Sequence, residues 1–369
     1  MHIPDGYLSP STCATMYVAS AGFWWQALRR TRRQMLGRAL PRLALMAAFC
    51  FVVMLFNLPL PGGTTGHALG VGIAAIVLGP WGGMMAVSLA LAIQALFFGD
   101  GGITTLGANC FNMAIAGSIT AWGLYQLIGM GSTANSKRRL VAAALAGYGS
   151  INLAALLAAI ELGIQPMLFH DASGAPLYAP YPLHVAIPAM MAGHLTIAGV
   201  AEALMTAGLF GYLRRNEPGL VGLAKDATPR TPRSLWGGLA LLMLLAPLGI
   251  LAGGAAWGEW APKDFADQAA RAQIAAASGN VAAPTVAPIG LARLAGVWTA
   301  PLPEYAPRFV KSAGFGYLLS AIFGVGIILG VVWLVQLIAA RKGEDAEKGA
   351  AKRIEPEHFE TDPKQERGR

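Results

Sequence analysis

Charged residues are scarce in this chain of 369 residues, in which Asp, Glu, Lys and Arg together make up 12%. Soluble globular domains carry about 25%, so the composition excludes an ordinary water-exposed surface. Hydrophobic residues make up 55%, and the mean hydropathy is +0.52. The sequence therefore predicts a protein whose solvent is the lipid bilayer, because apolar runs long enough to cross it recur along the chain.

Several motifs are also missing. The three cysteines, Cys13, Cys50 and Cys110, lie far apart in apolar sequence, which favours buried thiols over a disulfide framework or a thiolate metal site. Neither the GxxxxGK[ST] loop of ATPases nor the HExxH motif of zinc peptidases occurs, so the chain lacks the motifs of an ATPase and of an intramembrane metalloprotease. No basic region leads into an apolar core at the start, and we expect Met1 to be retained.

The apolar runs predict helices, because runs such as 140–160 are hydrophobic on every face and lack the alternation of a β-barrel. We predict an all-α, polytopic integral membrane protein of the bacterial plasma (inner) membrane, with about nine transmembrane helices. The expected spans are 11–29, 40–57, 67–79, 82–98, 107–130, 139–161, 183–213, 235–256 and 313–340. The third is short enough to be re-entrant.

Basic residues predict the orientation. With the N-terminus outside, 22 of the 27 Lys and Arg residues lie in cytoplasmic segments, and the other five lie in one external segment, 257–312. This bias predicts an external N-terminus, a cytoplasmic C-terminus and a third segment that crosses fully. The basic cytoplasmic loops account for the net charge of +8, which requires no nucleic-acid partner. The same loops can also contact anionic membrane lipid.

Changes in composition predict the domain boundaries. Residues 216–234 are polar and rich in proline, which predicts a cytoplasmic linker between a seven-helix unit, 1–215, and a two-helix unit, 235–340. Segment 257–312 is expected to form an external loop within the second unit, and its middle is low in complexity. Residues 341–369 are expected to form a charged cytoplasmic tail.

The first two residues, Met1 and His2, form a potential chelator. The α-amine, the backbone amide nitrogen of His2 and His2 Nδ1 can bind one metal in adjoining five- and six-membered rings. A further imidazole completes a square-planar set of four nitrogens, which suits Ni(II) or Cu(II) and is accessible to Co(II). Because the amide must lose its proton, binding should weaken as the pH falls.

A second imidazole, that of His67, follows the sequence PGGTTG at the external start of a predicted helix. It lies on the same side of the membrane as the N-terminus. A purely structural role is one interpretation of a single histidine at a helix start. Ionisable groups at the membrane edge are costly, however, and usually have partners or functions.

The sequences MHIPDGYLSP, PGGTTGH, LGPWGG and FGDGGITTLGANCFNM together resemble the CbiM/NikM family. Its members are substrate-specific components of energy-coupling-factor transporters for cobalt and nickel. The resemblance covers about residues 1–215 and implies seven helices, the first of which delivers the N-terminus into the interior. It also implies that the Met1 amine, the His2 amide nitrogen and Nδ1, and His67 bind the metal.

The sequences WGEWAPKDF, PLPEYAPRF and GYLLSAIFGVGIILG are similar to the small NikN/CbiN-like (PDGLE-type) accessory component, fused here to the first unit. The resemblance further implies a transmembrane coupling (T) subunit and cytoplasmic ATPase subunits as partners, with no cofactor beyond the transported ion. Small residues such as Ala143 and Gly147 are candidates for the docking surface.

Other polar residues allow two interpretations each. Asn109 and Asn112 could orient the metal ligands through hydrogen bonds to His67 or the N-terminal segment, or they could join helices. Asp100 is expected to cap a helix rather than to bind the metal. His170, His184 and His194 could capture the metal transiently, but interfacial hydrogen bonds are the favoured interpretation. Glu202 is an unusual acid inside an apolar helix, where it could pair with His194 or another polar group or stay protonated.

We therefore predict a membrane subunit that captures a divalent metal ion for ATP-driven uptake. The planar nitrogen set and the MHIPDG opening favour nickel. Cobalt uptake for cobalamin biosynthesis is the first alternative. A passive metal-ion channel is the alternative from another class, although it would require rings of polar residues along a pore rather than one compact cluster.

Overall fold

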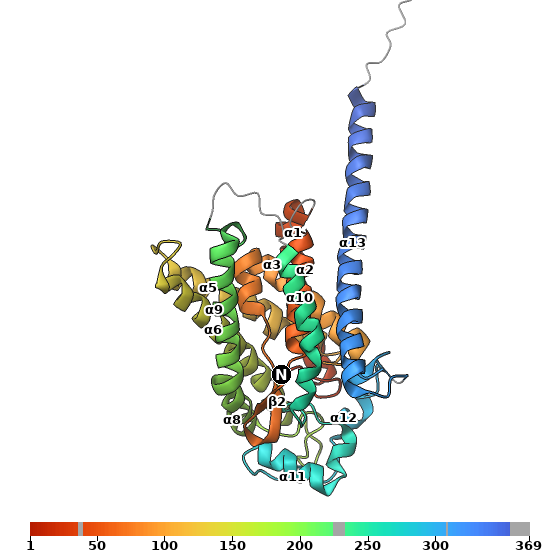
Figure 1. Cartoon of the computed structure of the whole chain (residues 1–369). Helices are drawn as coiled ribbons and strands as arrows, with labels where there is room; N and C mark the ends of the chain where they lie inside the picture. The colour runs from red at the N-terminus through yellow and green to blue at the C-terminus, as the bar shows by residue number, and fades with distance from the viewer. Residues whose placement is uncertain (36–39, 224–232, 308, 355–369) are drawn as a thin grey trace, which may run out of the picture.

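The structure is a computed structural model, and it describes residues 1–35, 40–223, 233–307 and 309–354 (Figure 1). Its α-helices are α1 (Pro10–Met35), α2 (Leu40–Met54), α3 (Val71–Ile93), α4 (Leu106–Asn109), α5 (Gly117–Gly129), α6 (Lys137–Gly163), α7 (Gln165–Leu168), α8 (Leu183–Gly193), α9 (Gly199–Asn216), α10 (Arg233–Leu245), α11 (Gln268–Ala277), α12 (Ile289–Leu294) and α13 (Ala313–Ile354).

Short helical turns extend several of these helices. The π-helical turns are Gln94–Phe98 after α3, Cys110–Ala116 between α4 and α5, and His194–Ala198 between α8 and α9. The 3-10 turns are Pro61–Gly63, Pro218–Val221, Ala246–Leu251, Pro262–Phe265 and Pro303–Tyr305. Each predicted membrane span overlaps a helical stretch, and the third and fourth spans both overlap α3.

Five stretches of the described chain are long and apolar enough to cross a membrane. They are Val71–Phe98, Lys137–Leu168, Leu183–Asn216, Arg233–Leu251 and Ala313–Ile338. Large apolar side chains point outward from them, including those of Leu204, which is 69% exposed, and Leu251, which is 82% exposed. Contiguous apolar surface of this kind suits hydrocarbon rather than water, so the bundle is that of a multi-pass membrane protein.

The first of these stretches is broken at Gly79, whose backbone has φ 73° and ψ 172°. This positive φ favours glycine, and Pro80 follows directly. A Cβ atom placed on Gly83 would lie 2.9 Å from Cα of Ala75, so the residues on either side of the break lie side by side. The chain thus reverses between the third and fourth predicted spans.

Helix α6 lies inside the first unit and packs against α5, α8 and α9. Its small residues make these contacts close: a Cβ atom on Gly147 would lie 2.6 Å from Oγ1 of Thr206 on α9. Ala143 on the same helix is 0% exposed. The expectation that Ala143 and Gly147 face a partner subunit is therefore wrong, since both are covered by helices of the same chain.

A small antiparallel hairpin, absent from the all-α prediction, lies between α2 and α3. Its strands are β1 (Leu58–Leu60) and β2 (Thr64–Gly66). The amide of Thr65 donates a hydrogen bond of 3.3 Å to the carbonyl oxygen of Ala255, which joins the hairpin to the C-terminal unit. β2 ends directly before His67 and so fixes where that residue enters the bundle.

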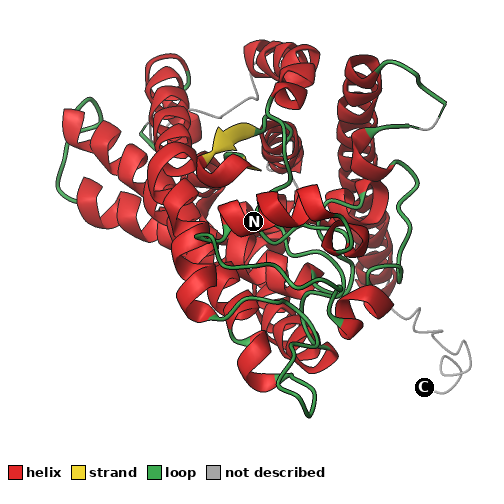
Figure 2. Cartoon of the chain, turned by 90° about the horizontal axis from the view of Figure 1, so that it is seen from below, coloured by secondary structure: helices red, strands yellow, loops and turns green. Residues whose placement is uncertain are grey.

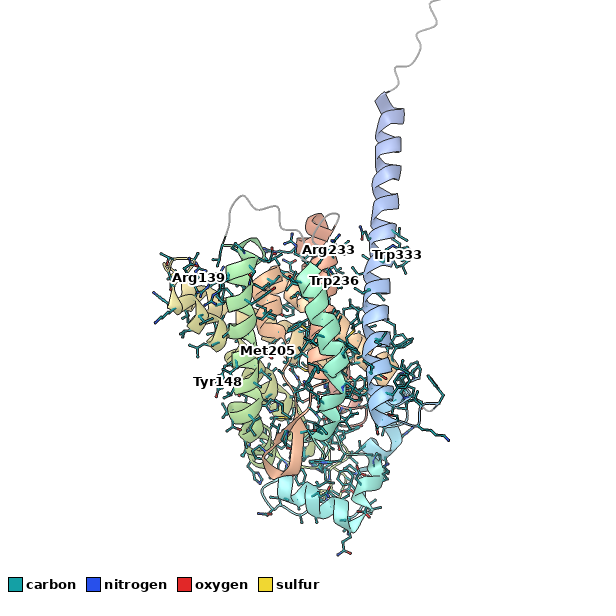
Figure 3. All side chains as sticks on the ribbon, viewed as in Figure 1. Arg139, Tyr148, Met205, Arg233, Trp236 and Trp333 are labelled. Carbon is teal, nitrogen blue, oxygen red and sulfur yellow. The ribbon has the colours of Figure 1, made fainter. Side chains whose placement is uncertain are left out.

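The C-terminal unit packs along the first one, with α10 and α13 both against α2. Glycine allows the close approach, because a Cβ atom on Gly324 of α13 would lie 2.1 Å from Cζ of Phe51 on α2. The segment between α10 and α13 forms α11 and α12 at one end of the molecule, and Figure 3 places Arg139 and Arg233 toward the opposite end. Helix α13 continues past its predicted end at residue 340 to Ile354.

Much of the predicted linker, 224–232, and the last part of the predicted tail, 355–369, lie outside the described residues. Before the linker, α9 ends at Asn216 and a 3-10 turn follows from Pro218 to Val221. The first residues are buried, and in the view from below the N-terminus lies among helices and loops near the middle of the molecule (Figure 2).

Candidate metal centre

The first residues of the chain are buried although they precede the first helix. Met1 and His2 are each 3% exposed and Ile3 is 0% exposed. A free chain end loses much conformational entropy when it is fixed in this way, so it stays buried only where many contacts hold it. The contacts come from three separate parts of the chain.

Asn109 at the end of α4 makes two of these contacts. Its Oδ1 accepts a hydrogen bond of 2.8 Å from the amide of Ile3, and its Nδ2 donates one of 3.0 Å to the Ile3 carbonyl oxygen. The amide of Gly102 donates to the same carbonyl at 2.9 Å. Both backbone groups of the residue after His2 are thus satisfied, and the direction of the N-terminal dipeptide is fixed.

Asp5 and Ser9 hold the next residues. The Asp5 carboxylate accepts hydrogen bonds from the amides of Ile103 at 3.1 Å and Thr104 at 2.7 Å. The amide of Ser9 donates to Oε1 of Gln165 at 3.0 Å. The contact with loop 99–105 explains why an acidic residue stands at position 5 of the MHIPDG opening.

Loop 99–105 approaches the N-terminal segment so closely that it has no room for side chains at two glycines. A Cβ atom on Gly102 would lie 2.3 Å from the amide nitrogen of Asp5. One on Gly101, which has φ +79°, would lie 3.5 Å from Cβ of His2 and 3.0 Å from Nδ2 of Asn109. The sequence GDGG is therefore required by close packing against the first five residues.

The two imidazoles that the sequence singled out meet. Nε2 of His67 lies 3.4 Å from Nδ1 of His2, and the ring centroids are 5.0 Å apart. Nδ1 of His67 donates a hydrogen bond of 3.0 Å to the carbonyl oxygen of Ala68, because a carbonyl can only accept. This assigns the proton to Nδ1 and leaves the lone pair of Nε2 directed at His2.

Two carboxylates also reach the N-terminal dipeptide. Oδ1 of Asp100 lies 3.0 Å from Nδ1 of His2, and Oε1 of Glu259 lies 3.1 Å from the Met1 amine. The expectation that Asp100 caps a helix is wrong: Thr105 is at the N-cap of α4, and the Asp100 carboxylate instead accepts from His2 and, at 2.6 Å, from the hydroxyl of Tyr305.

The charge on Asp100 is favoured by these neighbours. Burial alone would raise the pKa of the Asp100 carboxyl, but the nearby His2 outweighs it and holds the pKa well below its usual value. Asp100 is therefore an anion beside the histidine pair.

A cavity of about 730 Å³ opens beside these residues and is lined by both units. Its ionisable lining outside the histidines is mostly acidic: Asp5, Asp100, Glu259, Asp264, Glu304 and the single base Lys263. Such a field raises the local concentration of cations. The cavity thus places a mostly acidic lining beside the histidine pair.

Three further candidates lie elsewhere in the bundle. Asn112 donates a hydrogen bond of 2.9 Å to Oε2 of Glu161 and so joins two helices rather than contacting His67 or the N-terminal segment. His194 is 3% exposed, and its Nδ1 donates at 2.8 Å to the carbonyl oxygen of Met190. Nδ1 of His170 contacts the carbonyl oxygen of Asp171 at 3.1 Å in an exposed loop.

Side chains alone do not make a metal site here, because no group of three or more His, Cys, Asp or Glu in the described chain is arranged to hold an ion. A site at this position requires main-chain nitrogens. The Met1 amine, the His2 amide nitrogen, His2 Nδ1 and His67 Nε2 supply four nitrogens of the kind that binds Ni(II) or Co(II).

Comparison with known proteins gives matches over most of the chain. Residues 2–220 match the family described as the cobalt uptake substrate-specific transmembrane region. The chain is 55% identical over 335 residues to the fused nickel transport protein NikMN of Rhodobacter capsulatus, an alignment that covers 90% of this chain and 96% of the relative.

A probable fused nickel transport protein, LarMN of Lactiplantibacillus plantarum, is 41% identical over 332 residues, with 89% of this chain and 95% of the relative covered. Among solved structures, the crystal structure of a truncated transition metal transporter superposes with a TM-score of 0.55 at 48% identity. It covers 58% of this chain and 99% of the solved chain, so the fold of more than half of this chain recurs there.

Proposed function

Because this chain belongs to the family of cobalt and nickel transport proteins with the substrate-specific transmembrane region, we propose that it captures the metal for an energy-coupling-factor transporter. The observation that carries the proposal is the meeting of His2 and His67, whose nitrogens lie 3.4 Å apart beside a buried N-terminus. The first unit, residues 1–215, binds the ion, and the second, 235–340, is the accessory unit.

The proposed ligands are the Met1 amine, the His2 amide nitrogen, His2 Nδ1 and His67 Nε2. The His67 tautomer supports this assignment, because its Nδ1 proton is engaged by Ala68 and its Nε2 lone pair is free for a metal. When the metal binds, the Met1 amine would give up its contact with Glu259 and bind the ion. His2 Nδ1 would likewise give up its contact with Asp100. Asn109 holds Ile3 and so orients the ligands without touching the metal.

Nickel is the favoured cargo. A planar nitrogen set suits Ni(II), and the two fused relatives described above are named nickel transport proteins. Cobalt is the alternative, and the family description names it. A competition experiment, in which the purified protein is offered both ions, distinguishes the two. We expect the protein to retain nickel in preference to cobalt.

ATP hydrolysis is assigned to other subunits, because the sequence contains no phosphate-binding loop. The proposed assembly adds a transmembrane coupling subunit and cytoplasmic ATPases. We infer nine crossings, an external N-terminus and a cytoplasmic C-terminus. The chain reversal at Gly79 supports the count, because it divides the stretch Val71–Phe98 into two pieces that lie side by side.

A passive channel is the rival function. It predicts nickel uptake into vesicles that contain this chain alone, whereas a capture subunit requires the coupling and ATPase subunits and ATP. Uptake by the chain alone, unaffected by ATP, would establish the channel.

The direct test moves or removes single ligands. One glycine added before Met1 displaces the amine, and His67→Ala removes an imidazole; each should abolish nickel binding in calorimetry of the purified protein. His170→Ala, in an exposed loop, is the control and should bind as the parent does. Unchanged affinity in either of the first two variants would overturn the ligand assignment.

A further inference from the structure

Glu202 is an acid in the interior of the bundle, and its side chain contacts backbone rather than a basic residue. It lies in the first turn of α9 and is 0% exposed. Its Oε2 accepts hydrogen bonds from the amides of Leu69 at 2.7 Å and Gly70 at 3.0 Å, and its Oε1 accepts from Gly72 at 3.2 Å. One carboxylate thus binds three amides from a different part of the chain.

These amides belong to the start of α3. The first amides of a helix have no partner within the helix, and a negative charge there is favoured by the helix dipole. Gly70 is the N-cap of α3 and has no side chain to satisfy them. Glu202 does so from α9, because its two carboxyl oxygens accept three hydrogen bonds from these amides.

The residues that Glu202 holds follow directly on His67. Leu69 is two positions after His67, and the intervening Ala68 provides the carbonyl that fixes His67 Nδ1. The position of the imidazole is therefore set from one side by β2 and from the other by Glu202.

The same place is a close contact of three helices. A Cβ atom on Gly72 would lie 2.5 Å from Oγ1 of Thr206 on α9 and 2.9 Å from Cα of Gly147 on α6. The hydroxyl of Thr206 donates to Oε1 of Glu202 at 3.4 Å. Figure 3 labels Tyr148 and Met205, which lie near the middle of the molecule. They are the chain neighbours of Gly147 and Thr206. With no free space, α3 cannot shift against α9 without breaking these bonds.

We propose that Glu202 is a positioning residue for the metal centre: it fixes the segment that carries His67 and ties the direction of His67 Nε2 to the position of α9. A displacement of α9 against α3 pulls the imidazole away from the other three nitrogens. A partner subunit that displaces α9 would therefore weaken the metal site and release the ion. This inference rests on the proposed function.

The experiment compares purified variants by nickel affinity and by the visible ligand-field absorption of bound Ni(II). Glu202→Met fills the space but accepts no hydrogen bond, and Glu202→Gln keeps the shape with fewer acceptors. We expect affinity to fall about 10- to 100-fold in Glu202→Met, less in Glu202→Gln, with a shifted absorption band in both. Glu161→Gln, at a second buried acid that accepts a hydrogen bond from Asn112, should keep both properties.

Thermal unfolding without metal checks the fold of each variant, and if Glu202→Met does not fold, Glu202→Gln decides by the same criteria. Parental affinity and spectrum in a folded Glu202 variant would overturn the inference. Loss of affinity with an unaltered spectrum of the residual complex would also overturn it, since a positioning role changes the ligand geometry. If the parent itself binds no nickel, the proposed function fails instead, which separates the two outcomes.

Discussion

Glu259 and Met1 are 258 positions apart, yet Oε1 of Glu259 lies 3.1 Å from the α-amine. The C-terminal unit thereby contributes a charge to the site that the first unit builds. Glu259 is 23% exposed at its side chain, so it stands at the boundary between the buried dipeptide and the acidic cavity. Under the proposed function, an incoming cation would meet this carboxylate before it reaches the amine.

Replacing Glu259 should therefore slow capture. Glu259→Gln keeps the shape but removes a negative charge from the cavity, and we expect the association rate of nickel to fall about three- to tenfold at low ionic strength. Stopped-flow tryptophan fluorescence measures this rate. Asp171→Asn, in an exposed loop outside the cavity, is the matched control and should keep the parental rate. Equal rates for Glu259→Gln and the control would contradict the prediction.

Close packing at loop 99–105 gives a second prediction. Gly102→Ala places a methyl group 2.3 Å from the amide nitrogen of Asp5, so the N-terminal segment must move and nickel binding should be lost. Gly123→Ala on α5 adds the same methyl group where nothing lies within 4 Å, and it should bind nickel normally. Calorimetry compares the nickel affinities of the two variants. Normal binding by Gly102→Ala would show that nickel binding does not require the N-terminal segment to lie against loop 99–105.

The two asparagines separate orientation of the ligands from helix packing. Asn109→Ala removes two hydrogen bonds from Ile3 and should weaken nickel binding about 10- to 100-fold. Asn112→Ala removes a bond to Glu161 and should lower the unfolding temperature while leaving affinity unchanged. Equilibrium dialysis below the unfolding temperature measures the affinities, and equal losses in both variants would refute the distinction.

Acid should release the metal. The amine and the His2 amide must both lose protons to bind, so the apparent affinity should fall by up to about 100-fold for each unit of decreasing pH. Asp100 adds no step in this range, because its pKa is held well below the usual value and it stays ionised. Competition titrations between about pH 6 and 8 give the slope. A fall of no more than about tenfold per unit at the acid end of this range, which the proton of the amine alone explains, would remove the amide from the ligand set.

The sequence predicts helix positions well because apolar runs and glycine or proline boundaries act locally. Gly79 followed by Pro80 is such a boundary, and the chain reverses there. The apolar runs do not predict the hairpin β1–β2, because its strands are three residues each, and Asp100 is predicted as a cap because short acidic side chains favour helix N-termini. Its contact with His2 depends on tertiary packing.

Two other acids show where sequence reasoning ends. Glu259, in WGEWAP, has no local pattern that points to the amine of residue 1. Glu202 stands out as an acid in an apolar helix, but its partners are backbone amides, which every residue except proline possesses and which no side-chain pattern reveals. By contrast, Met1, His2 and His67 could be singled out because chelation requires particular nitrogens at particular positions.

The deep placement of the first residue, which is 3% exposed, makes its surroundings depend on parts of the chain that are synthesised at different times. Glu259, which lies 3.1 Å from the Met1 amine, follows it by 258 positions and leaves the ribosome on the order of tens of seconds later. The charge beside the amine is therefore added only after the helices around the N-terminal dipeptide have been made.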